Sequence, residues 1–199
     1  DLFTVKYIGK GIVKEYNNIL GKLISEGEYL NGKKNGKVKE YDGVFDTLIF
    51  EGEYLNGKRN GKGREYNCSG ELGFEGEYFY GKKWNGKGYD SNYNETYEII
   101  NGKGNVKEYY NDGKLKFEAE YLYGERHGKF KKYNSKGILE FDEEYLNGLR
   151  NGQAKQYYDN GNLLFEGYYL YDHKIKGKEY NKNGKISFEG EYLFNRKWN

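Results

Sequence analysis

Pairs of glutamates two residues apart recur along the chain, and they are the residues closest in type and spacing to a catalytic carboxylate pair. Three examples are Glu51/Glu53, Glu75/Glu77 and Glu189/Glu191. Two neighbouring carboxylates can act as general acid and general base. An active site, however, is built from residues that occur once, whereas this pair is repeated in most units. Cross-strand ion pairing, for example with Arg64, is therefore the favoured interpretation.

Basic residues recur at equivalent places within turns rich in Gly and Asn. They are Lys33, Lys34, Lys58, Arg59, Lys82, Lys83, Arg126, Arg150, Arg196 and Lys197. In a regular sheet these residues line one edge at intervals of roughly 10 Å, where each adds roughly 1 kcal/mol to binding of an anionic lipid surface. Solvated turns that prevent edge-to-edge aggregation explain the same pattern and are the favoured interpretation. Contact with lipid or another polyanion is the functional alternative.

One apolar residue per unit falls on the same strand face as the glutamates. The set is Leu30, Leu55, Phe79, Leu122, Leu146, Leu170 and Leu193. Because these residues recur in register, they predict a shallow apolar stripe that binds a partner helix or a second copy of the chain. Ordinary isolated surface apolar residues are the alternative, and the sequence alone does not decide between the two.

Residues that occur only once or twice offer little chemistry. His127 and His173 fall in turn regions without a repeated set of metal ligands, and Cys68 falls in a loop. The sequence contains no phosphate-binding loop and no nucleophile motif. We therefore expect no catalytic residue, no cofactor and no metal site, and a chain that is not an enzyme. Trp84 and Trp198 are expected to cap the aromatic stripe described below.

Short strands joined by tight turns carry these residues. Residues 50–55 alternate between two faces as a strand does, residues 56–61 form a turn cluster of Asn, Gly and basic residues, and residues 62–66 are expected to form a second strand. No stretch between Gly-rich turns reaches ten residues, so a helix cannot be fitted.

The unit of two strands is repeated along the whole chain. Its repeated tyrosine stands at Tyr29, Tyr54, Tyr78, Tyr121, Tyr145, Tyr169 and Tyr192, in steps of 25, 24, 43, 24, 24 and 23 residues. Tyr97 marks a shortened copy within the long step. This periodicity predicts an array of about eight units over residues 1–199, irregular near residues 79–102. Since the chain starts without Met and stops in mid-repeat, we expect it to be part of a longer array.

A stripe of aromatic residues is the predicted core. Its members are Phe50, Tyr54, Phe74, Tyr78, Phe117, Tyr121, Phe141, Tyr145, Phe165, Tyr169, Phe188 and Tyr192. A glycine two residues before most of these tyrosines leaves a notch across which a ring can lie. Ser25 replaces the usual Phe, so the first unit is expected to fray. Glu143 fills the notch, so the unit around Tyr145 is expected to be looser or open to a partner.

Composition agrees with a thin aromatic structure rather than a thick aliphatic core. Only 36% of residues are hydrophobic and the mean hydropathy is −1.10, while 24 residues are Tyr. The net charge of +2 gives no global attraction to nucleic acid. No apolar run approaches the length of a transmembrane segment. The single Cys68 and the absence of a signal-like segment favour a cytoplasmic location, including the cytoplasmic membrane surface. The fold class predicted is all-β: an elongated, single-layer antiparallel β-meander of tandem hairpins.

The run F-E-G-E-Y-L-N-G-K-R-N-G-K-G from Phe50 to Gly63 resembles the MORN repeat, and similar runs recur in nearly every unit. The segment from Lys107 to Leu115 is similar to the variant found in YwqK-type antitoxins. The resemblance implies an elongated single-layer sheet that acts as a scaffold. Arrays of this family dimerise, bind protein partners and have been linked to phosphoinositide membranes.

Three functional hypotheses follow from the surfaces and the resemblance. The first is a non-enzymatic scaffold for protein–protein interaction or self-association, with a protein partner or a homodimer. The second is peripheral binding to anionic phospholipid through the basic turns. The third is an antitoxin-like inhibitor that binds a toxin partner.

Overall fold

The protein is described by a computed structural model that covers residues 9–198, and every regular element in this range is a β-strand. The all-β prediction is therefore confirmed. The two chain ends from which we expected a longer array, Asp1 and Asn199, lie outside the described residues.

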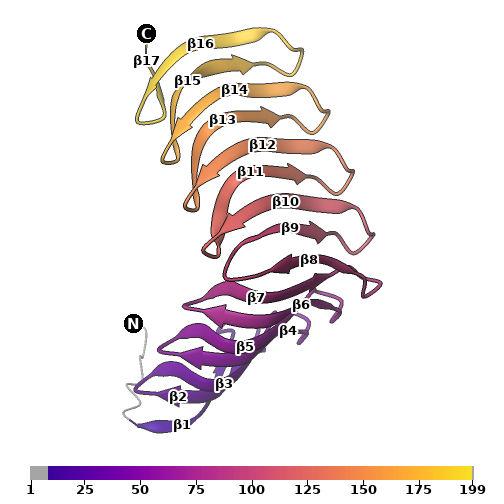
Figure 1. Cartoon of the computed structure of the whole chain (residues 1–199), viewed down its shortest axis with the longest axis vertical. Coiled ribbons are helices and arrows are strands. Elements are labelled where there is room, and N and C mark those ends of the chain that lie inside the picture. The colour runs from indigo at the N-terminus through magenta and orange to yellow at the C-terminus, as the bar shows by residue number, and fades with distance from the viewer. Residues whose placement is uncertain (1–8, 199) are drawn as a thin grey trace. The chain divides into compact units, whose positions relative to one another are not determined.

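The first eight strands form an N-terminal sheet in which each strand pairs antiparallel with the next one along the chain (Figure 1). The strands are β1 (Lys10–Tyr16), β2 (Leu23–Leu30), β3 (Lys33–Tyr41), β4 (Leu48–Leu55), β5 (Lys58–Tyr66), β6 (Leu72–Phe79), β7 (Lys82–Tyr89) and β8 (Glu95–Ile99).

The remaining nine strands form a C-terminal sheet with the same consecutive antiparallel order. The strands are β9 (Gly104–Tyr109), β10 (Leu115–Leu122), β11 (Glu125–Tyr133), β12 (Leu139–Leu146), β13 (Leu149–Tyr157), β14 (Leu163–Leu170), β15 (His173–Tyr180), β16 (Ile186–Leu193) and β17 (Arg196–Trp198). The meander thus consists of two sheets, and the chain divides into two compact units after Asn101, at the end of the irregular repeat.

The hairpin turns are shorter than the sequence suggests. Asn56 and Gly57 alone connect β4 to β5, with φ values of 51° and 84°, as a two-residue turn of this hand requires. The predicted turn over residues 56–61 is therefore wrong, because Lys58 and Arg59 already belong to β5.

A bulge in the returning strand accounts for the rest of the Gly- and Asn-rich cluster. In the hairpin of β4 and β5, Tyr54 pairs with Arg59 while Gly52 pairs with Gly63. Gly61 has a φ of 99°, and a Cβ there would collide with the Glu53 side chain. Glu53 accepts the backbone N–H of Lys62 at 3.0 Å. The second glutamate of the repeat therefore fixes the bulge, which is a structural role that the sequence did not reveal.

Aromatic rings form the core of each sheet. The predicted residues that are buried are Phe50, Tyr54, Phe74, Tyr78, Phe165, Tyr169 and Tyr192, and those that are half-buried are Phe117, Tyr121, Phe141, Tyr145 and Phe188. The ring of Phe50 is fully buried, and it lies across Gly52 and Gly63, which face each other in the hairpin. A Cβ at either glycine would come within 3 Å of the ring. Tyr54 and Tyr78 pack edge-on against Phe50, at 5.7 Å and 5.5 Å between ring centroids. A sheet of one layer can bury a ring this deeply because bare backbone lies beneath it.

The hairpin of β2 and β3 keeps this packing by exchanging the sizes of two side chains, while the fraying expected at Ser25 stays a prediction. Ser25 stands where Phe50 stands in the next hairpin, and Val38 stands where Gly63 does. Both side chains are buried. Ser25 Oγ donates to Glu15 at 2.5 Å and lies 3.1 Å from the Tyr29 hydroxyl. Val38 supplies the apolar volume that the absent ring would provide.

The centre of the C-terminal sheet shows a different exchange. Phe130 occupies the position of Gly63, and Glu143 occupies that of Gly52. Both side chains are buried, while Phe141 and Tyr145 are only half-buried. Phe130 packs between two rings of the neighbouring strands, at 5.3 Å from the Tyr145 centroid and 6.0 Å from the Phe117 centroid. Phe117 and Tyr121 in the preceding unit are half-buried as well, so half-burial is not particular to the unit around Tyr145, and its predicted openness to a partner stays a prediction.

The size exchange can be tested by transplanting the Ser25/Val38 pair. Phe50→Ser is expected to destabilise the N-terminal sheet by about 3 kcal/mol, and Gly63→Val by about 2 kcal/mol. The double variant reproduces the first hairpin and should be more stable than Phe50→Ser alone. Urea unfolding is followed by fluorescence in a Trp198→Phe background, which leaves Trp84 in β7 as the only tryptophan. Gly73→Ala, where a Cβ makes only ordinary contact, is the control. Additive losses in the double variant would contradict the exchange.

Candidate functional site

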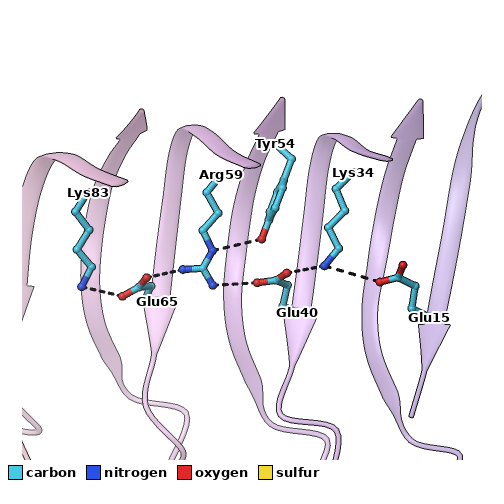
Figure 2. Close-up of polar contacts among 7 residues, drawn as sticks. All are labelled: Glu15, Lys34, Glu40, Tyr54, Arg59, Glu65 and Lys83. Carbon is cyan, nitrogen blue, oxygen red and sulfur yellow. Dashed lines mark hydrogen bonds and ion pairs between the residues drawn. The ribbon is translucent and has the colours of Figure 1, made fainter. Parts of the chain in front are cut away.

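Six of the ten predicted basic residues lie over rings of the aromatic face. Four of the six pair with glutamates there: Lys34, Arg59, Lys83 and Lys197. Figure 2 shows the resulting ladder in the N-terminal sheet, a row of alternating acidic and basic side chains that come from β1, β3, β5 and β7. It runs in the order Glu15, Lys34, Glu40, Arg59, Glu65 and Lys83. We call these six residues the charge ladder.

Arg59 is the centre of the charge ladder. Its guanidinium donates to Glu40 at 2.9 Å and to Glu65 at 2.5 Å, and its Nε donates to the Tyr54 hydroxyl at 3.3 Å. Its central carbon also lies 3.8 Å from the centroid of the Phe50 ring. The same side chain therefore covers the outer surface of the core ring and links two carboxylates.

Lysines take the equivalent place on both sides of Arg59. Lys34 donates to Glu40 at 2.6 Å, and Lys83 forms an ion pair with Glu65 at 2.8 Å. Lys83 lies 4.5 Å from the centroid of the Phe74 ring. Each of these cations is the second residue after a two-residue turn, so its side chain projects toward the aromatic face rather than along the edge.

The ladder shifts the acidity of its members. Burial raises the pKa of Glu40, but hydrogen bonds from Lys34 and Arg59 outweigh it and hold that pKa below its usual value. Burial likewise raises the pKa of Glu65, but the charges of Lys83 and Arg59 outweigh it and lower that pKa. At the first hairpin, burial raises the pKa of the Tyr29 phenol to about 12. At neutral pH the carboxylates are therefore ionised and the phenol is neutral, as a network of ion pairs requires.

The C-terminal sheet carries only part of such a ladder. Lys197 and Lys174 pair with Glu179 at 2.8 Å and 3.5 Å. Further along the sheet, Lys132 and Gln156 stand where the ladder has glutamates. Gln156 Nε2 donates to the buried Glu143 at 2.9 Å.

The same sheet also turns its arginines to other partners. Arg126 lies over Phe130, at 4.4 Å from the ring centroid, and Arg150 forms an ion pair with Asp172 at 2.9 Å. These residues cover rings or bond to a neighbouring turn, and they do not form an exposed basic edge.

The basic edge predicted for lipid contact is therefore smaller than the sequence suggests. The second basic residue of each turn, such as Arg59, lies over the core rings instead of at the edge. The first, such as Lys33 and Lys58, stays exposed beside the turn. Sequence reasoning did not predict the ladder, because it did not consider Glu15, Glu40 and Glu65 as partners of the basic residues. The available signal was the repeated Glu-Tyr dipeptide that includes Glu40 and Glu65.

The opposite face of each sheet bears the other charged residues and a shallow groove. The grooves have volumes of about 690 Å³ in the N-terminal sheet and about 740 Å³ in the C-terminal sheet, and glycine backbone forms part of each floor. Arg64 pairs with Glu75 at 2.8 Å and Lys178 with Glu189 at 3.0 Å. The predicted cross-strand pairing of Glu75 is confirmed. Acidic and basic residues alternate along these grooves, which therefore favour neither a polyanion nor a polycation.

The predicted apolar stripe lies beside the turns and is largely exposed. Leu55 is 45% exposed and Phe79 is 50% exposed, while Leu122 and Leu146 in the C-terminal sheet are half-buried. Each of these residues ends its strand next to a two-residue turn, so the stripe follows the turn edge of each sheet.

Aromatic residues at the turns add to this edge, and sequence reasoning missed them. Tyr80, Tyr123, Tyr171 and Phe194 hold the first turn position, with φ values of 48°, 53°, 47° and 49°. The equivalent position elsewhere is an asparagine such as Asn56. Asparagine tolerates this left-handed backbone, whereas a tyrosine there costs about 1 kcal/mol. Tyr80 is 58% exposed and Tyr123 is 66% exposed, so burial does not compensate for the cost. The available signal was the exchange of L-N-G for L-Y-G or F-Y-G.

The less frequent residues give no catalytic arrangement. Cys68 is exposed in a loop, and Trp84 packs against Phe79 at 5.3 Å rather than capping the aromatic stripe. Among residues 9–198, no group of three or more His, Cys, Asp or Glu side chains is placed to hold a metal ion. The same residues include no helix long and apolar enough to cross a membrane.

The fold and surfaces define a protein of tandem β-hairpins with a single aromatic ring layer as its core. Two stretches, residues 103–123 and 150–171, match the model of the MORN repeat variant. The resemblance to the MORN repeat that the sequence suggested is thereby confirmed over these two stretches. No curated protein matches the chain.

Breaking the charge ladder at its centre should be costly. Arg59→Met leaves Glu40 and Glu65 short of a positive partner in a half-buried position and is expected to destabilise the N-terminal sheet by about 3 kcal/mol. Arg64→Met removes an exposed ion pair on the opposite face and should leave the urea midpoint nearly unchanged. Equal effects of the two variants, measured through Trp84 fluorescence, would contradict the role of the ladder.

The ladder also predicts a loss of stability in acid. The pKa of Glu40 and of Glu65 lies below the ordinary value of 4.5 in the folded state. Their contribution is therefore complete above about pH 4.5 and is lost as the pH falls below it. Urea midpoints measured between about pH 7 and about pH 3 should decline mainly in the lower part of that range. The Glu40→Gln/Glu65→Gln variant should be less stable at neutral pH and decline less in acid. An unchanged decline would place the acid sensitivity elsewhere.

Proposed function

We propose that the protein is a non-enzymatic scaffold whose turn edges bind protein partners. The observation that carries this proposal is the presence of Tyr80, Tyr123, Tyr171 and Phe194 in left-handed turns, exposed to solvent. The left-handed backbone costs each of them stability that asparagine does not lose, and local backbone strain is a mark of functional positions. Large exposed aromatic side chains are typical anchors of protein interfaces.

The geometry of the edge supports the same function. Hydrogen bonds link consecutive turns, for example from the N–H of Gly57 to the carbonyl of Lys34 and from the N–H of Gly81 to the carbonyl of Arg59, both at 2.8 Å. The turns are thus fixed relative to one another, and a partner meets a surface that is already ordered. Preorganisation of this kind lowers the entropic cost of binding.

Membrane binding and toxin inhibition stay predictions. The basic edge would be the lipid contact, but Lys34, Arg59 and Lys83 are engaged in the charge ladder. This leaves fewer cations for an anionic surface, and the repeated apolar residues beside them have no role in a purely electrostatic contact. Binding of a protein partner uses both the exposed cations and the apolar residues of the turn edge.

Two substitutions that should raise stability and weaken binding test the proposal. Tyr80→Asn and Tyr123→Asn each create the Asn-Gly turn already present at Asn56, and each should raise stability by about 1 kcal/mol. If these tyrosines serve binding, the same variants should capture less partner from an extract of the source cell, measured by quantitative mass spectrometry, or self-associate less in sedimentation velocity.

Ile19→Asp is the matched control, because Ile19 is 92% exposed in the loop at the other end of the strands. It should leave capture and self-association unchanged. Variants at Tyr80 and Tyr123 that gain stability without losing any association would overturn the proposed function.

A further inference from the structure

The turn edge of the N-terminal sheet carries a regular alternation of cationic and apolar residues. From β1 to β7 the residues are Lys10, Leu30, Lys33, Leu55, Lys58, Phe79 and Lys82. Leu30 pairs directly with Lys33, Leu55 with Lys58 and Phe79 with Lys82. Residues directly opposite in an antiparallel pair share one face, so these seven residues form one row, which we call the cationic–apolar row.

The row is accessible and ordered. Leu30, Leu55 and Phe79 are all exposed, as are Lys33 and Lys58. The turn-to-turn hydrogen bonds described above, together with one from the Asn31 N–H to the Gly9 carbonyl at 3.0 Å, hold the turns at the spacing of the sheet. At one end, Tyr80 and Trp84 pack on Phe79 at 4.7 Å and 5.3 Å and widen the apolar surface.

The spacing of the row fits an α-helix laid along it. The apolar residues stand on every second strand, so their spacing is about 9.6 Å. Seven residues of an α-helix span about 10.5 Å, which differs by only about 1 Å per step. An extended chain repeats its side-chain orientation at about 6.8 Å and fits this spacing poorly. A helix with one apolar seam of heptad period therefore meets Leu30, Leu55 and Phe79 in turn.

Charge specifies the flanks of that helix. A lysine separates each apolar residue of the row from the next, so acidic residues beside the seam find partners and basic residues are repelled. The C-terminal sheet does not share this charge pattern. There, Leu122 pairs with Glu125 and Leu146 pairs with Leu149.

We propose that the cationic–apolar row binds an amphipathic helix that has an apolar seam of heptad period flanked by acidic residues. This inference rests on the proposed protein-binding function and specifies the partner class for one of the two sheets. The lysines set the orientation and salt dependence of binding, and the apolar residues with the Phe79, Tyr80 and Trp84 cluster supply the buried contact.

A designed peptide tests the proposal on the full chain. The probe has three heptads, with leucine at positions a and d, glutamate at e and g, and fluorescein at its N-terminus. Fluorescence anisotropy is expected to show saturable binding that weakens with added salt. Leu55→Asp should weaken binding at least about tenfold, and Lys58→Glu should weaken it and reduce its salt dependence. Ile19→Asp and, in the other sheet, Leu149→Asp should bind like the unmodified chain. Circular dichroism checks that each variant keeps its strand signal.

Two control peptides separate the outcomes. A peptide of the same composition with its leucines out of heptad spacing, and one with lysine in place of glutamate, should each bind more weakly. Equal binding of all three peptides, or no binding of the heptad peptide, would overturn the inference. So would salt-sensitive binding to phosphatidylserine vesicles that Lys58→Glu abolishes, in the absence of peptide binding. Loss of partner capture in the Tyr80→Asn variant would leave the broader scaffold function standing in any of these cases.

Discussion

The contact between an aromatic ring and two facing glycines is the interaction on which each sheet depends. The surroundings of Phe50 show how the other interactions follow from this contact. A single-layer sheet has no second layer to cover a ring, so the ring lies against the bare backbone of Gly52 and Gly63. Its outer surface still needs cover, and the Arg59 side chain provides it. A half-buried cation in turn requires carboxylates, which Glu40 and Glu65 supply. The charge ladder is therefore a consequence of the core and not a separate feature.

This origin of the ladder decides which charges are left for other molecules. In the N-terminal sheet the charge ladder pairs the cations and carboxylates of the aromatic face, and on the opposite face Arg64 pairs with Glu75 across strands. The turn edge keeps exposed cations such as Lys33 and Lys58 beside its apolar residues, while Lys10 at the same edge pairs with Glu28 at 3.4 Å. There the chain places exposed apolar side chains such as Leu55 and strained aromatic ones such as Tyr123. The proposed function uses these residues, which the repeat does not need for folding.

Departures from the repeat follow the same constraint. The Ser25 and Val38 pair keeps the volume of the core when the ring is lost. Phe130 and Glu143 do so differently, by placing the ring on the returning strand and a carboxylate in the notch. The sequence predicted that Glu143 would loosen its unit, because it could be compared with the glycine of its neighbours. It did not predict that Val38 would compensate for Ser25, since the two residues lie on different strands and their contact depends on the pairing register.

The sequence by itself determined the class of fold, the repeated unit, the aromatic core and the stripe of apolar residues, because each follows from periodicity of side chains along one strand. Only the tertiary structure decided where the basic residues go. A two-residue turn followed by a bulge places Lys58 at the edge and Arg59 over a ring, although the two are adjacent in the chain. The division into two sheets also emerged only there. Both outcomes depend on hydrogen-bond register between strands, and alternation within a single strand carries no information about that register.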